Sequence, residues 1–140
     1  MTANKNALNQ YKKVGVQGGV EAATPHRLIQ MLMDGALERI SIAKGFINTN
    51  EIARKGESIS SAIAIIDGLS ISLDKKAGGE IADNLEALYD YMKRRLLEAN
   101  LNNDIEILDE VVSLMLEVKM GWDAIPEEFK VPGAVKRPNE

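Results

Sequence analysis

The side chains best suited to catalysis or metal binding are scarce in this sequence. It contains one histidine, His26, and no cysteine. A di-iron helical bundle needs inward glutamates and repeated Glu-x-x-His pairs, yet no glutamate stands three positions before His26. Thiol chemistry is excluded, and no Ser/His/Asp or Cys/His arrangement is recognisable. We therefore expect neither an enzyme nor a bound metal or other cofactor.

Two further features resemble parts of functional sites. Gly78-Gly79 precede a helical segment, as in phosphate-binding loops, but no strand precedes them and no Gly-Lys-Ser/Thr run is present. A helix stop explains the glycines better, because glycine adopts the left-handed conformation that ends helices. Asp67 could accept a hydrogen bond from a partner's backbone, or it could be a solvated acid at the edge of a core stripe.

The most informative segment runs from Ser58 to Leu73, SISSAIAIIDGLSISL, which has a helical pattern but only one charge, Asp67. Its inward stripe has helical 3-4 spacing and consists of Ile59, Ala62, Ile66, Leu69 and Leu73. A surface helix normally carries charged residues on its other side. Here that side is an uncharged strip of Ser61, Ala64, Ile65, Gly68, Ile71 and Ser72. Such a strip can seat another helix, unless this is simply the most buried helix of the protein.

Four periodic segments must position this strip. The first begins at Thr24-Pro25, which suit a helix cap and a first helical turn, and its seam is Ile29, Met33, Ala36, Ile40, Ala43 and Ile47. The second covers about 51–74 and is stopped by Ala77-Gly78-Gly79. The third covers about 80–100, with Ile81, Leu85, Leu88, Met92, Leu96 and Ala99 inward. The fourth follows Asp104 as cap, with Leu108, Val111, Met115, Val118 and Trp122 inward.

Short connections between long helices favour antiparallel neighbours. The expected fold is therefore all-α, an antiparallel up-down four-helix bundle over 24–123. Residues 1–23 form an N-terminal arm whose apolar anchors Leu8, Tyr11 and Val14 could fold back as a lid. Residues 124–140 are proline-rich and are expected to form a poorly ordered, flexible tail. Met31 and Met120 lie off the seams, where a flexible thioether could contact a partner.

Composition limits the possible partners. The 140 residues, 45% of them hydrophobic, suit one domain with its own core. A net charge of -4 argues against nucleic-acid binding. No apolar run approaches the ~18–20 residues of a membrane span or resembles a signal peptide, so we expect a cytoplasmic protein without membrane insertion.

Several separated motifs occur together in a familiar order. They are TPHRLIQML from Thr24, Asp34-Gly35-Ala36, Lys55-Gly56-Glu57, AIIDGL from Ala64, GGEIA from Gly78 with Asn84-Leu85, LYDYM from Leu88, and Leu96-Leu97. In this respect residues 8–125 resemble the flagellin export chaperone family, FliS. Met33 stands where that family usually has tyrosine, a change that keeps an apolar group at the seam.

The resemblance implies a cytoplasmic chaperone of flagellar type III export. Members of the family form antiparallel helical bundles and hold the disordered C-terminal segment of flagellin, which prevents premature polymerisation. They also assist delivery of flagellin to the flagellar export gate. In the family the N-terminal arm covers the hydrophobic groove when the client is absent, and its tyrosine corresponds to Tyr11 here.

We expect one flagellin segment to bind along the second helix, in a groove that combines its strip with a wall from the first helix. The expected groove residues are Leu32, Ile42, Phe46, Ser61, Ala64, Ile65, Gly68 and Ile71. The alternative for the first-helix residues is ordinary packing against a neighbouring helix. A different class of function stays open, a structural helical-bundle protein that homodimerises through the uncharged face of its second helix.

Overall fold

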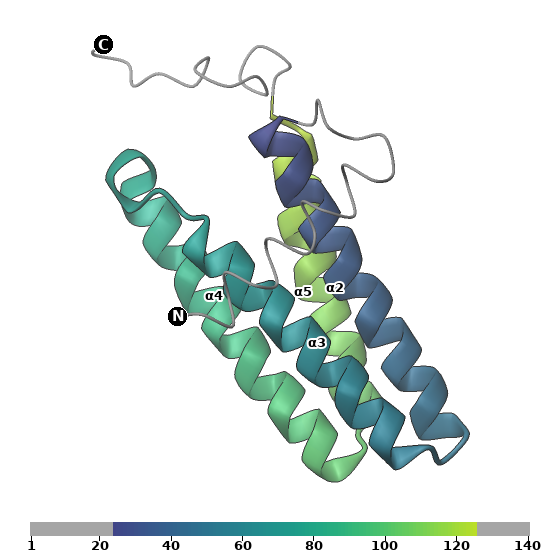
Figure 1. Cartoon of the computed structure of the whole chain (residues 1–140). Coiled ribbons are helices and arrows are strands. Elements are labelled where there is room, and N and C mark those ends of the chain that lie inside the picture. Colours follow the sequence, from purple (N-terminus) through teal and green to yellow (C-terminus); the bar gives the residue numbers. More distant parts are fainter. Residues whose placement is uncertain (1–23, 126–140) are drawn as a thin grey trace.

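The computed structural model describes residues 24–125. They form four α-helices, α2 (Pro25–Asn48), α3 (Ile52–Ile71), α4 (Lys75–Asn102) and α5 (Ile105–Asp123). Figure 1 shows successive helices running in opposite directions, with α3 between α2 and α4 and with α5 behind. Each of the four packs on two neighbours in a ring, and in the diagonal pairs α2/α4 and α3/α5 no Cα atoms come within 8 Å of one another. The predicted all-α, up-down four-helix bundle is confirmed.

The helix starts follow local capping chemistry. Thr24 caps α2, because its side-chain hydroxyl accepts a hydrogen bond from the Arg27 amide at 3.1 Å. Asp104 caps α5 by accepting from the Ile107 amide at 3.2 Å. A side-chain oxygen at this position satisfies an amide that has no partner within the helix. Both predicted starts are confirmed.

The boundary between α3 and α4 differs from the expectation. Helix α3 ends at Ile71 rather than near residue 74, and Asp74 instead caps α4 by accepting from the Ala77 amide at 3.0 Å. The glycine pair lies inside α4, where Gly79 (φ 51°, ψ -124°) interrupts the helix. A Cβ at Gly78 would lie 2.8 Å from the Ala82 Cβ. The two glycines therefore permit a break within α4 and do not stop the preceding helix.

The core is built from the seams of all four helices. The predicted seam residues that are fully buried or nearly so are Met33, Ala36, Ile40, Ala43, Ile59, Ala62, Ile66, Leu69, Met92, Leu96, Ala99, Leu108, Val111 and Met115. Trp122 packs against this core as expected. Its ring stacks on that of His26, with centroids 4.7 Å apart, and its Nε1–H donates to the His26 carbonyl at 3.0 Å. This contact joins the end of α5 to the start of α2.

The start of α4 departs from the predicted seam. Ile81 was expected inward but is 70% exposed, whereas Ala82 and Tyr89 are buried. Figure 1 shows the α3–α4 turn set apart from the neighbouring ends of α2 and α5, so Ile81 has the right spacing but no opposing helix to cover it. Further along α4, burial raises the pKa of Tyr89 to about 12.

The opposite end of the bundle is closed by a buried lysine. Lys55 of α3 is only 4% exposed. Its ammonium donates to the Asn100 carbonyl at 2.8 Å and to the Asn103 side-chain oxygen. Carbonyls at a helix C-terminus have no partner within the helix and carry negative partial charge. Lys55 therefore caps the end of α4 from the neighbouring helix.

Candidate functional site

The outer side of α3 carries the uncharged strip that the sequence predicts. Ser61 and Ala64 are half-buried, and Ile71 is 48% exposed. On α2, Ile42 is exposed and Phe46 is half-buried. These side chains retain apolar surface that another segment could cover. We call Ser61, Ala64, Gly68 and Ile71 the α3 strip.

Two of the expected groove residues lie elsewhere. Leu32 of α2 has no exposed surface, and Ile65 of α3 is 3% exposed. Both belong to the hydrophobic core, where they hold the helices of the bundle together. The expectation that their side chains are accessible to a partner is wrong, because the sequence does not reveal how closely neighbouring helices pack.

Gly68 gives the α3 strip its shape. It is buried, yet a Cβ built on its backbone would have no heavy atom within 4 Å. The backbone is therefore recessed between taller neighbours, with room above it. A glycine or alanine in such a position allows a second helix to approach closely, which larger side chains prevent.

Toward α2, a charged residue borders the α3 strip. The Nε–H group of Arg39 donates to the Ser61 hydroxyl at 3.1 Å. The Arg39 guanidinium also lies 3.6 Å from the Glu38 carboxylate. The helical pattern alone does not show this contact, since it depends on a long side chain reaching from one helix to the next.

Toward α4, an ion pair forms the other border. Lys93 lies 2.5 Å from the Asp67 carboxylate and 3.4 Å from that of Asp90. Burial opposes the charge of Lys93, but the hydrogen bond and attraction of Asp67 outweigh it and raise the pKa of Lys93. Asp67 thus pairs with Lys93 inside the protein. This supports the interpretation of Asp67 as an acid at the edge of the core stripe, and not as a hydrogen-bond acceptor for a partner.

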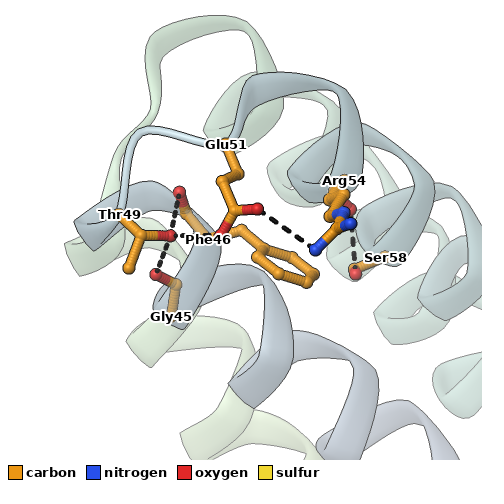
Figure 2. Close-up of polar contacts among 6 residues, drawn as sticks. All are labelled: Gly45, Phe46, Thr49, Glu51, Arg54 and Ser58. Atoms are coloured by element: carbon orange, nitrogen blue, oxygen red, sulfur yellow. Dashed lines mark hydrogen bonds and ion pairs between the residues drawn. The ribbon is translucent and has the colours of Figure 1, made fainter.

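The turn between α2 and α3 closes one end of the site. Figure 2 shows the Phe46 ring on the same side of the turn as the ion pair between Glu51 and Arg54, whose atoms are 3.2 Å apart. The Thr49 hydroxyl donates to the Glu51 carboxylate at 2.8 Å, and the Ser58 hydroxyl donates to the Arg54 carbonyl at 3.0 Å. Charged and polar side chains therefore lie beside Phe46 at this turn (Figure 2), while the α3 strip toward Ile71 contains no charged residue.

The site is suited to binding rather than to reaction chemistry. The side chains of the α3 strip offer methyl, methylene and hydroxyl groups, and Phe46 of α2 adds an aromatic ring; all of these can pack against a segment of polypeptide. Across residues 24–125 no three His, Asp or Glu side chains are grouped as metal ligands. None of the described helices is long and apolar enough to cross a bilayer. The expected lid residues Leu8, Tyr11 and Val14, and the expected tail beyond residue 125, lie outside the described residues.

Comparison with known proteins identifies the family. The sequence profile described as "Flagellar protein FliS" matches residues 7–128. The flagellar secretion chaperone FliSB of Pseudomonas aeruginosa is 52% identical over 119 residues, which cover 85% of this chain and 94% of that protein. The flagellar secretion chaperone FliS of Salmonella typhimurium is 46% identical over 86% of this chain and 90% of its own length. That of Vibrio cholerae is 42% identical, over 89% and 92% respectively. The chain belongs to the FliS family.

Proposed function

We propose that this protein is a cytoplasmic chaperone of flagellar type III export that binds the disordered C-terminal segment of flagellin. The observation that carries the proposal is the α3 strip, a recessed, uncharged surface between the Arg39 border and the Lys93 border. A free flagellin segment exposes apolar faces that would pair with other flagellin molecules. The strip offers those faces an equivalent surface and thereby prevents premature polymerisation.

The proposed client lies along α3 as a helix, with Ala64 and Gly68 allowing close approach. Ile71 supplies exposed apolar surface at one end, and Ile42 with Phe46 provides a wall from α2. Ordering a disordered segment typically costs ~2–5 kcal/mol, so such complexes bury about 1,000–3,000 Å². The α3 strip is therefore one part of a longer contact made by a client that wraps around the bundle.

Release requires no nucleotide in this mechanism. The proposed complex contains one chaperone and one flagellin, and the flagellar export gate displaces the chaperone by competing for the client. The arm residues Leu8, Tyr11 and Val14 are proposed to cover the groove when no client is bound. Deleting residues 1–16 should then tighten binding of a flagellin C-terminal peptide, whereas weaker binding would mean that the arm grips the client.

Substitution at Gly68 tests the client site. Gly68→Arg would place a long charged side chain in the recess, so we expect isothermal titration calorimetry to show at least tenfold weaker binding of a flagellin C-terminal peptide. Gly68→Ala should bind nearly normally, since its Cβ meets no atom within 4 Å. Gly121→Arg is the matched control, because Gly121 is exposed, has equal space, and lies on the diagonally opposite helix α5.

Circular dichroism should show the same helix content for all three variants. Equal affinity of Gly68→Arg and the native chain would remove the α3 strip as the client site. Light scattering distinguishes the homodimer alternative, which predicts a dimer of the free protein that Gly68→Arg converts to a monomer.

A further inference from the structure

Helix α5 presents an exposed face that the proposed client site does not use. Its largest apolar residues are Leu116, which is 47% exposed, and Met120, which is 70% exposed. They are four positions apart and therefore adjacent along one side of the helix. Glu106, Asp109 and Glu117 are exposed on the same side. We call these five residues the α5 outer face.

The α5 outer face is negatively charged around its apolar pair. No exposed residue of α5 is basic, but Lys44 of α2 lies 2.6 Å from the Asp109 carboxylate. Glu106 and Glu117 are therefore the acids of this face that make no ion pair with another described residue. The one lysine of the helix, Lys119, is engaged by Asp123 at 2.8 Å and by Asp34 at 3.6 Å. Met120 also lies in the last turn of α5, where the helix dipole adds negative potential. An apolar pair in this setting favours a partner that combines apolar and basic groups.

The ring arrangement of the helices separates this face from the α3 strip. Helices α3 and α5 are diagonal, and none of their Cα atoms come within 8 Å of each other. A segment bound to α5 would therefore leave the α3 strip accessible.

We propose that the α5 outer face docks a basic amphipathic helix from a second protein. Apolar side chains of that helix, spaced three or four residues apart, pack on Leu116 and Met120. Its lysines or arginines lie opposite Glu117 and Glu106, the two acids of the face that Lys44 does not pair. Because two apolar side chains cover little area, the contact is weak and reversible, and it falls in strength as salt screens the charges. The inference goes beyond the proposed function and does not depend on flagellin being the client.

A synthetic probe tests the proposal with the full chain. The probe is an 18-residue fluorescein-labelled amphipathic helix of leucine and lysine, and its charge-reversed counterpart contains leucine and glutamate. Fluorescence anisotropy should show saturable binding of the lysine peptide, weakened by salt, and no binding of the glutamate peptide. The double variant Leu116→Ser/Met120→Ser should bind the lysine peptide at least fivefold more weakly.

The matched control is the same change on α4, Leu97→Ser/Leu101→Ser, where both leucines are exposed and four positions apart. This variant should bind the probe within twofold of the native chain. Equal losses in the two double variants, or equal binding of both peptides, would overturn the proposal. Displacement of the probe by a saturating flagellin peptide would show that the client and the probe share a surface, and it would overturn the assignment of this face to a second protein. If the native chain is a dimer and Leu116→Ser/Met120→Ser makes it a monomer, the α5 outer face serves self-association and the proposal is overturned.

Discussion

The contact between Trp122 and His26 offers a direct measure of how firmly α5 is held against α2. Trp122 contributes a hydrogen bond of 3.0 Å to the His26 carbonyl and a stacked ring contact at 4.7 Å. Trp122→Phe removes the hydrogen bond but keeps an aromatic ring. Trp122→Leu removes both the hydrogen bond and the aromatic stacking, while retaining an apolar side chain.

The expected losses follow from these two terms. A hydrogen bond between neutral groups contributes about 0.5–1.5 kcal/mol, so Trp122→Phe should lower the free energy of unfolding by about 1 kcal/mol. An aromatic pair adds ~0.5–1.5 kcal/mol beyond its buried area. Trp122→Leu loses both terms and should therefore cost about 2 kcal/mol before any further loss from its smaller side chain.

Urea unfolding followed by circular dichroism provides the measurement, since the variants lack the tryptophan fluorescence signal. A double-mutant cycle with Trp122→Leu and His26→Leu should give a coupling energy of about 1 kcal/mol between the two side chains. A coupling energy near zero would refute the reasoning, because the rings would then be adjacent without stabilising one another. Equal losses for Trp122→Phe and Trp122→Leu would likewise show that stacking contributes nothing.

Two further predictions concern packing and pH. Ile81 is exposed and Met92 is fully buried. Ile81→Ser should therefore change the free energy of unfolding by less than ~0.5 kcal/mol, whereas Met92→Ala should lower it by ~2–5 kcal/mol. Similar losses for the two variants in thermal unfolding would contradict the burial pattern. Hydrogen bonds from Tyr91 and Arg95 lower the pKa of Glu110 from its ordinary 4.5. Its stabilising contribution is present above that value and is lost as pH falls through the lower folded pKa. Glu110→Gln should therefore show a smaller stability loss on acidification in urea titrations, and an unchanged acid profile would exclude this role.

Local sequence signals predicted most of the fold, but they did not show which helix a breaker interrupts. Thr24 and Asp104 begin helices as expected, since capping depends on residues within one turn. Asp74 also had the chemistry of a cap, yet the glycines after it suggested a longer preceding helix. Gly79 instead breaks α4 near its start. A glycine pair looks the same in the sequence whether it ends one helix or interrupts the next. Which of the two occurs depends on how the helices pack in the folded protein.

The sequence predicted which side of α3 carries the candidate site, but not which of its residues are buried. Spacing placed Ala64 and Ile71 on the outer side of α3, where the structure leaves them partly or largely accessible. The same reasoning assigned Leu32 and Ile65 to the accessible surface, although both are buried by neighbouring helices. Helical periodicity gives the direction of a side chain from its own axis. It does not give the distance to the next helix, nor the reach of long side chains such as Arg39.

The ring of helices has a consequence for how the chain folds. Three of its four packed pairs join helices that are consecutive in the sequence, and only α2 with α5 brings distant segments together. Contacts between consecutive helices require closure of short loops, so they form rapidly and at modest entropic cost. Docking of α5 on α2 closes the longest loop and is expected to come late. The interface between α2 and α5 is then where we expect the bundle to open first by local unfolding.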